Sequence, residues 1–288
     1  MITFPKTHEM CYYRVERNCS VTLATVMVLF GLLASSLAQA TISAKSILIT
    51  DLDSGQVLLA KNDTAQRSIA SITKLMTVLT VLESQQDLTE QLEIRRVRGI
   101  SSYIPANITN LTREKLIDLA MVSSDNTAAY NLCYHYNGGY HNCIYEMNAL
   151  ARRWNLANTY FIDPTGLFNQ NVSTADDLAV ILKQSLQYPY LQQHGAMQNV
   201  QVNYEARKKQ RNTRDKTNSA YNFYNTNRLL NVRSNIVITK TGWISASGGC
   251  IAMVVTKHAK NFAVVLLGST NTHTRLTEAD QLIRSYID

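Results

Sequence analysis

SITKLMTVLTVL, residues 71–82, is the segment from which the fold can be worked out. Leu75 and Leu79 recur at helical spacing, which predicts a helix with Ser71 in its first turn. A lysine three residues after a serine lies on the same face of such a helix, one turn away. Lys74 is therefore predicted to reach the Ser71 hydroxyl.

Strands are predicted on both sides of this helix along the chain. Before it, residues 45–61 form a predicted hairpin, in which Asp53-Ser54-Gly55 turns between two short apolar runs. After it, the last third of the chain contains β-rich runs at 236–241, 250–256 and 262–268, and a closing helix over 276–287.

The middle of the chain is predicted to be mostly helical. Thr112 is placed to cap a helix that carries Leu116 and Leu119, and Thr174 with Asp177 resembles a capping box. Strands at both ends with helices between them predict an α+β fold, in which the terminal segments meet in one antiparallel sheet beside a helical lobe.

The first 40 residues have the layout of a secretory signal. Arg14 and Arg17 precede an apolar run over 21–37, and small residues end in Ala38-Gln39-Ala40. The alternative is an uncleaved membrane anchor, because about 20 apolar residues can span a bilayer. Residues 41–288 are expected to form a single domain with no additional C-terminal domain, its sheet lobe at about 41–80 and 190–288 and its helical lobe at about 81–189.

The net charge indicates which classes of macromolecule the chain is expected to bind. The formal net charge of +7 favours an anionic wall polymer or membrane surface, whereas export argues against nucleic acid. The basic run at 207–211 is either a solvated loop or a docking patch for anionic envelope components.

The cysteines leave two alternatives open. Cys133 and Cys143 could pair, or they and Cys250 could be three buried thiols. The residue spacing predicts no metal site and no cofactor.

Three short motifs carry the predicted chemistry, and they occur in the order Ser71-Ile72-Thr73-Lys74, Ser124-Asp125-Asn126 and Lys240-Thr241-Gly242. Each motif alone could be a helix cap, a turn or a strand end. Their order and their placement on a helix start, a helical-lobe loop and a strand match the signature of penicillin-interacting serine enzymes.

The residue types fit acyl transfer to a serine. Ser71 is the candidate nucleophile, and Lys74 is its candidate base if burial or a nearby cation such as Lys240 lowers the pKa of its amine. Ser124 would pass a proton to the leaving amine.

The substrate would be held by the other positions of the motifs. The Asn126 amide could bind the substrate backbone, while Lys240 and Thr241 offer a cation and a hydroxyl to a carboxylate. Gly242 lets the substrate lie close to the strand, and the backbone N–H groups of Ser71 and Trp243 are the candidate oxyanion donors. Trp243 could equally only cover the sheet edge.

The chain from about residue 45 to its end resembles the D-alanyl-D-alanine carboxypeptidase and endopeptidase family, the low-molecular-mass penicillin-binding proteins. Segments outside the motifs are similar to the DD-endopeptidase type, penicillin-binding protein 7: these are residues 101–105, 111–114, 138–140, 161–167, 171–175 and 225–227. The segment 245–250 departs from the family pattern.

The resemblance implies a DD-peptidase/β-lactamase-like fold and an acyl-serine intermediate. It implies cleavage of D-Ala–diaminopimelate cross-links in peptidoglycan peptides, covalent inhibition by β-lactams, and a location in the periplasm of a Gram-negative cell. By the same resemblance, Ser71, Lys74 and Ser124 are catalytic, and Asn126, Lys240 and Thr241 match family positions one for one.

Three other functions stay open from the sequence. A D-Ala-D-Ala carboxypeptidase would use the same residues. A serine β-lactamase would need a way to direct water onto the acyl-serine, yet no convincing Glu-x-x-Leu-Asn segment lies between Asn126 and Lys240. A non-catalytic wall-binding or β-lactam-sensing protein is disfavoured by the intact Ser71, Lys74 and Ser124.

Overall fold

The computed structural model describes residues 42–207 and 216–288, and residues 42–288 form one compact unit. The predicted export segment and residues 208–211 of the basic run lie outside the described residues. No helix within the described part of the chain is long and apolar enough to cross a membrane.

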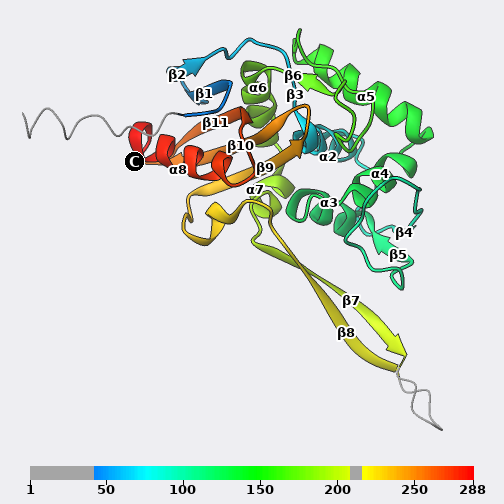
Figure 1. The fold of residues 1–288 in the computed structure, drawn as a ribbon. Coiled ribbons are helices and arrows are strands. Elements are labelled where there is room, and N and C mark those ends of the chain that lie inside the picture. The colour runs from blue at the N-terminus through cyan, green and yellow to red at the C-terminus, as the bar shows by residue number, and fades with distance from the viewer. Residues whose placement is uncertain (1–41, 208–215) are drawn as a thin grey trace, which may run out of the picture. The chain divides into compact units, whose positions relative to one another are not determined.

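A five-stranded antiparallel sheet in the order β2-β1-β11-β10-β9 forms the centre of this unit (Figure 1). Its strands are β1 Ser46–Asp51, β2 Val57–Lys61, β9 Ile236–Ile244, β10 Gly248–Lys257 and β11 Lys260–Ser269. Ile47 of β1 pairs with Leu266 of β11, so the predicted meeting of the two ends of the chain in one sheet is confirmed. β9 is an edge strand, so no further strand of this sheet pairs with its outer side, and other segments can pack there.

The two faces of the sheet bury different cores, since successive side chains of a strand point to opposite faces. Ile47 and Ile49 pack with α8 (Thr274–Tyr286) in one cluster. Leu48 belongs to a larger cluster that includes residues of α6 (Ala175–Ser185) and the other helices. The α+β fold class predicted from the sequence is confirmed.

The helix predicted from residues 71–82 is α2 (Thr73–Glu83), and it is buried along most of its length. Around it lie α3 (Arg113–Val122), α4 (Asn126–Tyr134) and α5 (Gly139–Arg153). The remaining short elements are α7 Pro189–His194, the 3-10 turns η1 Ala70–Ile72 and η2 Arg228–Asn231, and strands β3 Arg67–Ser68, β4 Gln91–Glu93, β5 Asn110–Thr112 and β6 Val172–Ser173.

Both predicted helix caps are present. The Thr112 hydroxyl accepts a hydrogen bond from the Lys115 backbone nitrogen at 3.2 Å, and Thr174 accepts one from Asp177 at 3.0 Å. The capping box is only half formed, because the Asp177 carboxylate accepts instead from the Thr159 hydroxyl at 2.7 Å. The sequence identified the cap correctly but not this tertiary contact.

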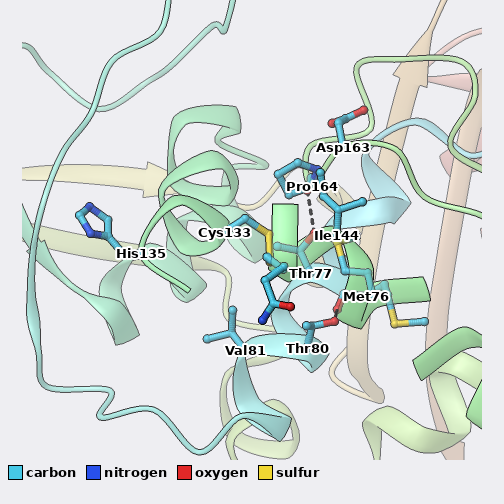
Figure 2. Close-up of a disulfide and its surroundings, with 12 residues drawn as sticks. Met76, Thr77, Thr80, Val81, Cys133, His135, Ile144, Asp163 and Pro164 are labelled. Carbon is cyan, nitrogen blue, oxygen red and sulfur yellow. Dashed lines mark hydrogen bonds between the residues drawn. A yellow bond between two sulfur atoms is a disulfide. The ribbon is translucent and has the colours of Figure 1, made fainter. Parts of the chain in front are cut away.

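Cys133 of α4 and Cys143 of α5 form a disulfide, with a Cα–Cα distance of 5.2 Å. Figure 2 shows the bridge together with Thr77 and Val81 of α2, so three helices meet there. Cys250 is a buried free thiol. The sequence left open a disulfide or three buried thiols, and the structure contains the disulfide.

One hairpin was not predicted from the sequence. Strands β7 (Asn199–Arg207) and β8 (Lys216–Tyr224) pair with each other and form a separate two-stranded sheet. At the base of this hairpin Val200, Val202 and Phe223 are buried. The alternation of apolar and polar residues over 199–204 was the available signal.

Candidate active site

The turn that carries Ser71 leads directly into α2. Ser71 belongs to the 3-10 turn η1 rather than to the α-helix itself, which corrects the predicted first turn by a few residues. Ala70, immediately before it, has a φ of +47°, a conformation that non-glycine residues seldom adopt. Such local strain clusters at functional positions, because the surrounding structure must hold it in place.

Lys74 contacts Ser71 as the spacing predicted. Its Nζ lies 2.9 Å from the Ser71 Oγ, and it also donates to the Asn126 Oδ1 and to the Thr165 carbonyl, each at 2.7 Å. The side chain is completely buried. Burial lowers the pKa of the Lys74 amine to about 7, although the negative charges of Asp125 and Asp163 oppose the shift.

Ser124 lies between α3 and α4 with a φ of +58°. Its hydroxyl accepts a hydrogen bond from the Nζ of Lys240 at 2.9 Å, and Lys240 also donates to the Thr241 carbonyl. Burial, followed by the charge of Lys74, holds the pKa of Lys240 well below its usual value. Each lysine therefore contacts one serine of the site, Lys74 the Ser71 hydroxyl and Lys240 the Ser124 hydroxyl.

Asn126 makes two contacts within the protein. Its Oδ1 accepts from Lys74, and its Nδ2 donates to the Ser101 hydroxyl at 2.8 Å. In this arrangement the amide positions the lysine. The second N–H of the amide has no hydrogen-bond partner among the described residues, so the predicted contact with a substrate backbone needs no rearrangement of the Ser101 hydrogen bond.

Gly242 brings β9 against the turn of the nucleophile. A Cβ at Gly242 would lie 2.9 Å from both the Ile69 carbonyl oxygen and the Ser71 nitrogen, closer than real Cβ atoms come. The next residue, Trp243, has half of its surface exposed (50%). Glycine at position 242 thus allows the edge strand to lie beside the nucleophile.

A cleft of about 280 Å³ connects these groups. Among its lining residues are Ser71, Ser101, Tyr103, Ser123, Ser124, Asn126, Leu167, Thr226, Thr241, Gly242, Trp243, Thr272 and Arg275. Six of the eight predicted site residues line the cleft, and the other two, Lys74 and Lys240, are buried behind the hydroxyls of Ser71 and Ser124. Folding therefore gathers all three motifs at one place.

Residues 34–271 match the sequence profile of the D-alanyl-D-alanine carboxypeptidase family, peptidase family S11. The chain belongs to this family of serine peptidases. A D-alanyl-D-alanine endopeptidase of Escherichia coli K12 is 34% identical over 263 residues, which cover 88% of this chain and 80% of that protein. Another protein of that name from Pseudomonas aeruginosa is 35% identical, with 85% and 78% covered.

The fold has relatives among solved structures. Penicillin-binding protein D2 of Listeria monocytogenes, solved in an ampicillin-bound form, matches with a TM-score of 0.75 at 22% identity, and 87% of this chain and 99% of that chain are covered. The Streptomyces K15 DD-transpeptidase matches with a TM-score of 0.74 at 23% identity, with 86% and 98% covered. At these identities the likeness concerns the fold.

The peptidase also has a supporting turn whose contact with the active site the sequence analysis missed. The Asp163 Oδ1 accepts from the Thr165 backbone nitrogen and hydroxyl and from the Gly166 nitrogen, so Asp163 and Thr165 shape this turn. This turn presents the Thr165 carbonyl to Lys74. The Pro164 carbonyl accepts a hydrogen bond from Thr77 of α2 at 2.8 Å (Figure 2).

Gly166 in the same turn packs against the backbone before Ser71. Its φ is +80°, and a Cβ there would lie 1.9 Å from the Ala70 carbonyl oxygen. The Asp-Pro-Thr-Gly sequence at 163–166 was the available signal, because Asp and Gly at these positions are typical of a tight turn. What the turn supports is visible only in the folded chain.

Arg275 of α8 is a second residue that the sequence analysis missed. It is 6% exposed and donates from Nη1 to the Gly242 carbonyl at 2.6 Å, while its Nε has no hydrogen-bond partner among the described residues. Burial lowers the pKa of Arg275 to about 10. A single arginine in a terminal helix carries no sequence signal of such a role.

One group of potential metal ligands occurs among the described residues, formed by Glu114, Asp118 and His194. The buried Asp118 carboxylate accepts hydrogen bonds from the Tyr190 hydroxyl at 2.6 Å and lies 2.9 Å from the His194 Nδ1. These contacts tie α3 to α7, and none of the three residues lines the cleft.

Proposed function

We propose that the protein is a D-alanyl-D-alanine endopeptidase that cleaves cross-links of peptidoglycan peptides through an acyl-Ser71 intermediate. The observation that carries the proposal is the contact of the buried Lys74 amine with the Ser71 hydroxyl at 2.9 Å. Membership of the serine peptidase family and the two relatives named D-alanyl-D-alanine endopeptidase support it.

Lys74 is suited to act as the base. A neutral amine has two N–H donors and one lone pair. With Asn126 Oδ1 and Thr165 O accepting the two hydrogens, the lone pair is directed to the Ser71 hydroxyl. A pKa of about 7 keeps much of the amine neutral at physiological pH.

Acylation then follows in balanced steps. Lys74 takes the Ser71 proton while the Oγ attacks the carbonyl carbon of D-Ala, and backbone N–H groups of Ser71 and Trp243 stabilise the oxyanion. Collapse of this intermediate breaks the peptide bond: Ser124 gives its hydroxyl proton to the leaving amine and receives in its place the proton that Lys74 took from Ser71, so Lys74 is neutral again. Water then gives a proton to Lys74 as its oxygen attacks the acyl carbon, and Lys74 returns this proton to the Ser71 Oγ when the acyl–serine bond breaks.

The substrate carboxylate next to the broken bond would have two partners that line the cleft and one that is buried behind it. Thr241 offers a hydroxyl on β9 and Arg275 a guanidinium whose Nε is unpaired among the described residues, while the charge of a bound carboxylate would favour the protonated form of the buried Lys240 amine. Charge-assisted hydrogen bonds are about twice as strong as neutral ones, so this group would anchor the peptide.

Digestion of purified muropeptides tests the proposal. We expect the protein to hydrolyse a cross-linked dimer to monomers, with the products identified by mass spectrometry, and to bind fluorescent penicillin covalently. The matched control is Ser71→Ala, which removes only the nucleophilic oxygen and should abolish both reactions. Failure of the wild-type protein to hydrolyse the dimer would refute the endopeptidase assignment.

The same experiment separates the alternatives. Release of D-Ala from a pentapeptide muropeptide without dimer cleavage would indicate a carboxypeptidase. Rapid turnover of penicillin instead of a long-lived adduct would indicate a β-lactamase, because that activity requires fast hydrolysis of the acyl-serine.

We place the protein in the periplasm, attached to wall or membrane at most peripherally. The Cys133–Cys143 disulfide supports this location, since such bonds persist in oxidising compartments. The sequence of the first 40 residues, which has the layout of a secretory signal, supports export. N-terminal sequencing of the protein from a periplasmic extract tests both the location and cleavage before Thr41.

A further inference from the structure

A second cavity, of about 410 Å³, adjoins the cleft that contains Ser71. It is lined by Tyr103, Ser123, Tyr221, Asn222, Phe223, Tyr224, Asn225, Thr226 and Arg228. Three of these residues, Tyr103, Ser123 and Thr226, also line the cleft. The two hollows are therefore neighbours with a common wall, and a long ligand can occupy both.

The walls of this cavity are held in place by hydrogen bonds. The Tyr103 backbone nitrogen donates to the buried Asp125 carboxylate, which lies between Ser124 and Asn126 in the chain. The Tyr221 hydroxyl reaches the Asn107 side chain at 3.4 Å. A site whose walls are fixed before binding loses less entropy when it orders a ligand.

The position of the cavity along β9 indicates which part of a substrate it faces. The candidate oxyanion donors are at Ser71 and Trp243, and the candidate carboxylate partner, Thr241, lies two residues back along the strand. The Thr241 hydroxyl is hydrogen-bonded to that of Thr226 at 2.6 Å, and Thr226 is part of the common wall. The cavity thus continues the cleft on the side of the leaving amine.

The chemistry of the cavity suits an extended leaving group. Its tyrosine and phenylalanine rings give apolar contact, and Phe223 is 7% exposed while Tyr224 is 57% exposed. Arg228 is exposed and makes no hydrogen bond or ion pair with any residue that the structure describes. An aliphatic chain that ends in a carboxylate would meet both the rings and the guanidinium.

We propose that this cavity is a subsite for the leaving half of a peptide cross-link, in which the aromatic rings contact the aliphatic chain of a diamino acid and Arg228 pairs with a carboxylate of the stem peptide beyond it. The proposal rests on the proposed function. A terminal D-alanine has only a methyl side chain, and its one carboxylate would be held at Thr241, so no part of it reaches the subsite. The cavity therefore favours cross-links over free D-Ala-D-Ala ends.

The test compares two reactions of the same nucleophile in the full-length protein. Hydrolysis of a cross-linked muropeptide dimer uses the subsite, whereas acylation by fluorescent penicillin has no leaving peptide. We expect Arg228→Gln to lower kcat/KM for the dimer about tenfold, mainly through KM, and to leave penicillin acylation unchanged. The matched control is Arg152→Gln, which removes an exposed arginine of α5 outside both cavities.

A second variant tests the cavity without relying on charge. Asn222→Trp places an indole on the exposed wall of the cavity and should lower dimer hydrolysis at least tenfold, again with normal penicillin acylation. Dimer hydrolysis at the wild-type rate by both variants would overturn the subsite. Loss of both reactions to the same degree would also overturn it. A wild-type protein that acylates with penicillin but does not hydrolyse the dimer would instead refute the proposed function.

Discussion

Replacing Gly242 by alanine tests whether the edge strand must touch the turn of the nucleophile. The added Cβ would lie 2.9 Å from the Ile69 oxygen and the Ser71 nitrogen, so the strand must shift by about 0.5 Å to reach the 3.4 Å of ordinary contact. Because a misplacement of about 1 Å in an active site costs roughly 10²-fold, and loss of an oxyanion donor about 10²- to 10³-fold, we expect acylation by fluorescent penicillin to slow about 10- to 100-fold.

A measurement of Tm shows whether the Gly242→Ala protein loses activity only because it is less stable. Overpacking of this kind costs about 1–3 kcal/mol, or roughly 2–4 °C of Tm per kcal/mol in a protein of this size. Gly195→Ala is a comparison variant, since its Cβ would lie 2.4 Å from the Leu191 carbonyl oxygen and near Ile238, which is four residues before Gly242 in β9. It should lower Tm and leave the acylation rate unchanged. A folded Gly242→Ala protein that acylates at the wild-type rate would refute the reasoning.

Three further predictions concern the groups around the nucleophile. Acylation should rise about tenfold per pH unit below pH 7 and level off above it, because only the neutral Lys74 amine is a base, and a rate that is flat from about pH 5 to 9 would contradict this. Asp163→Asn should lower Tm by several degrees, because the amide nitrogen that replaces Oδ2 cannot accept the hydrogen bonds of the Phe168 backbone nitrogen and the Asn171 side chain, and it should move the midpoint of the pH profile to lower pH, because the Asp163 charge raises the pKa of Lys74. Replacing Cys133 and Cys143 together by alanine should lower the free energy of unfolding by about 2–3 kcal/mol in urea titrations, and an unchanged midpoint would show that the bridge does not stabilise the fold.

Local sequence patterns predicted most elements of the fold. The hairpin, the three late strands and the capped helices depend on periodicity and on residues a few positions apart, and these are properties of a short segment. The hairpin of β7 and β8 was missed because its outer part carries mostly polar residues, so its alternation is weak. Its base is ordered by burial of Phe223 against the rest of the molecule.

The pairing of cysteines illustrates a different limit. Three cysteines outside the predicted export segment allow several pairings, and spacing along the chain does not select one. The packing of α4 against α5 brings Cys133 to Cys143, while Cys250 is buried in β10.

The contact of Ser71 with Lys74 was predictable from residue types and helical geometry, because two residues one turn apart meet in any helix. The other partners of the lysine were not, since Asn126 and the Thr165 carbonyl come from distant parts of the chain and face Lys74 only after the helices pack. The packing of the helices also buries Lys74, and this burial lowers the pKa of its amine. The short motifs were therefore enough to predict the chemistry. Only the tertiary structure decided how the base is positioned, what the Asp163 turn supports and where the cavity beside Thr226 lies. These features depend on contacts between segments that are distant in the sequence, and the sequence does not reveal which of them meet in space.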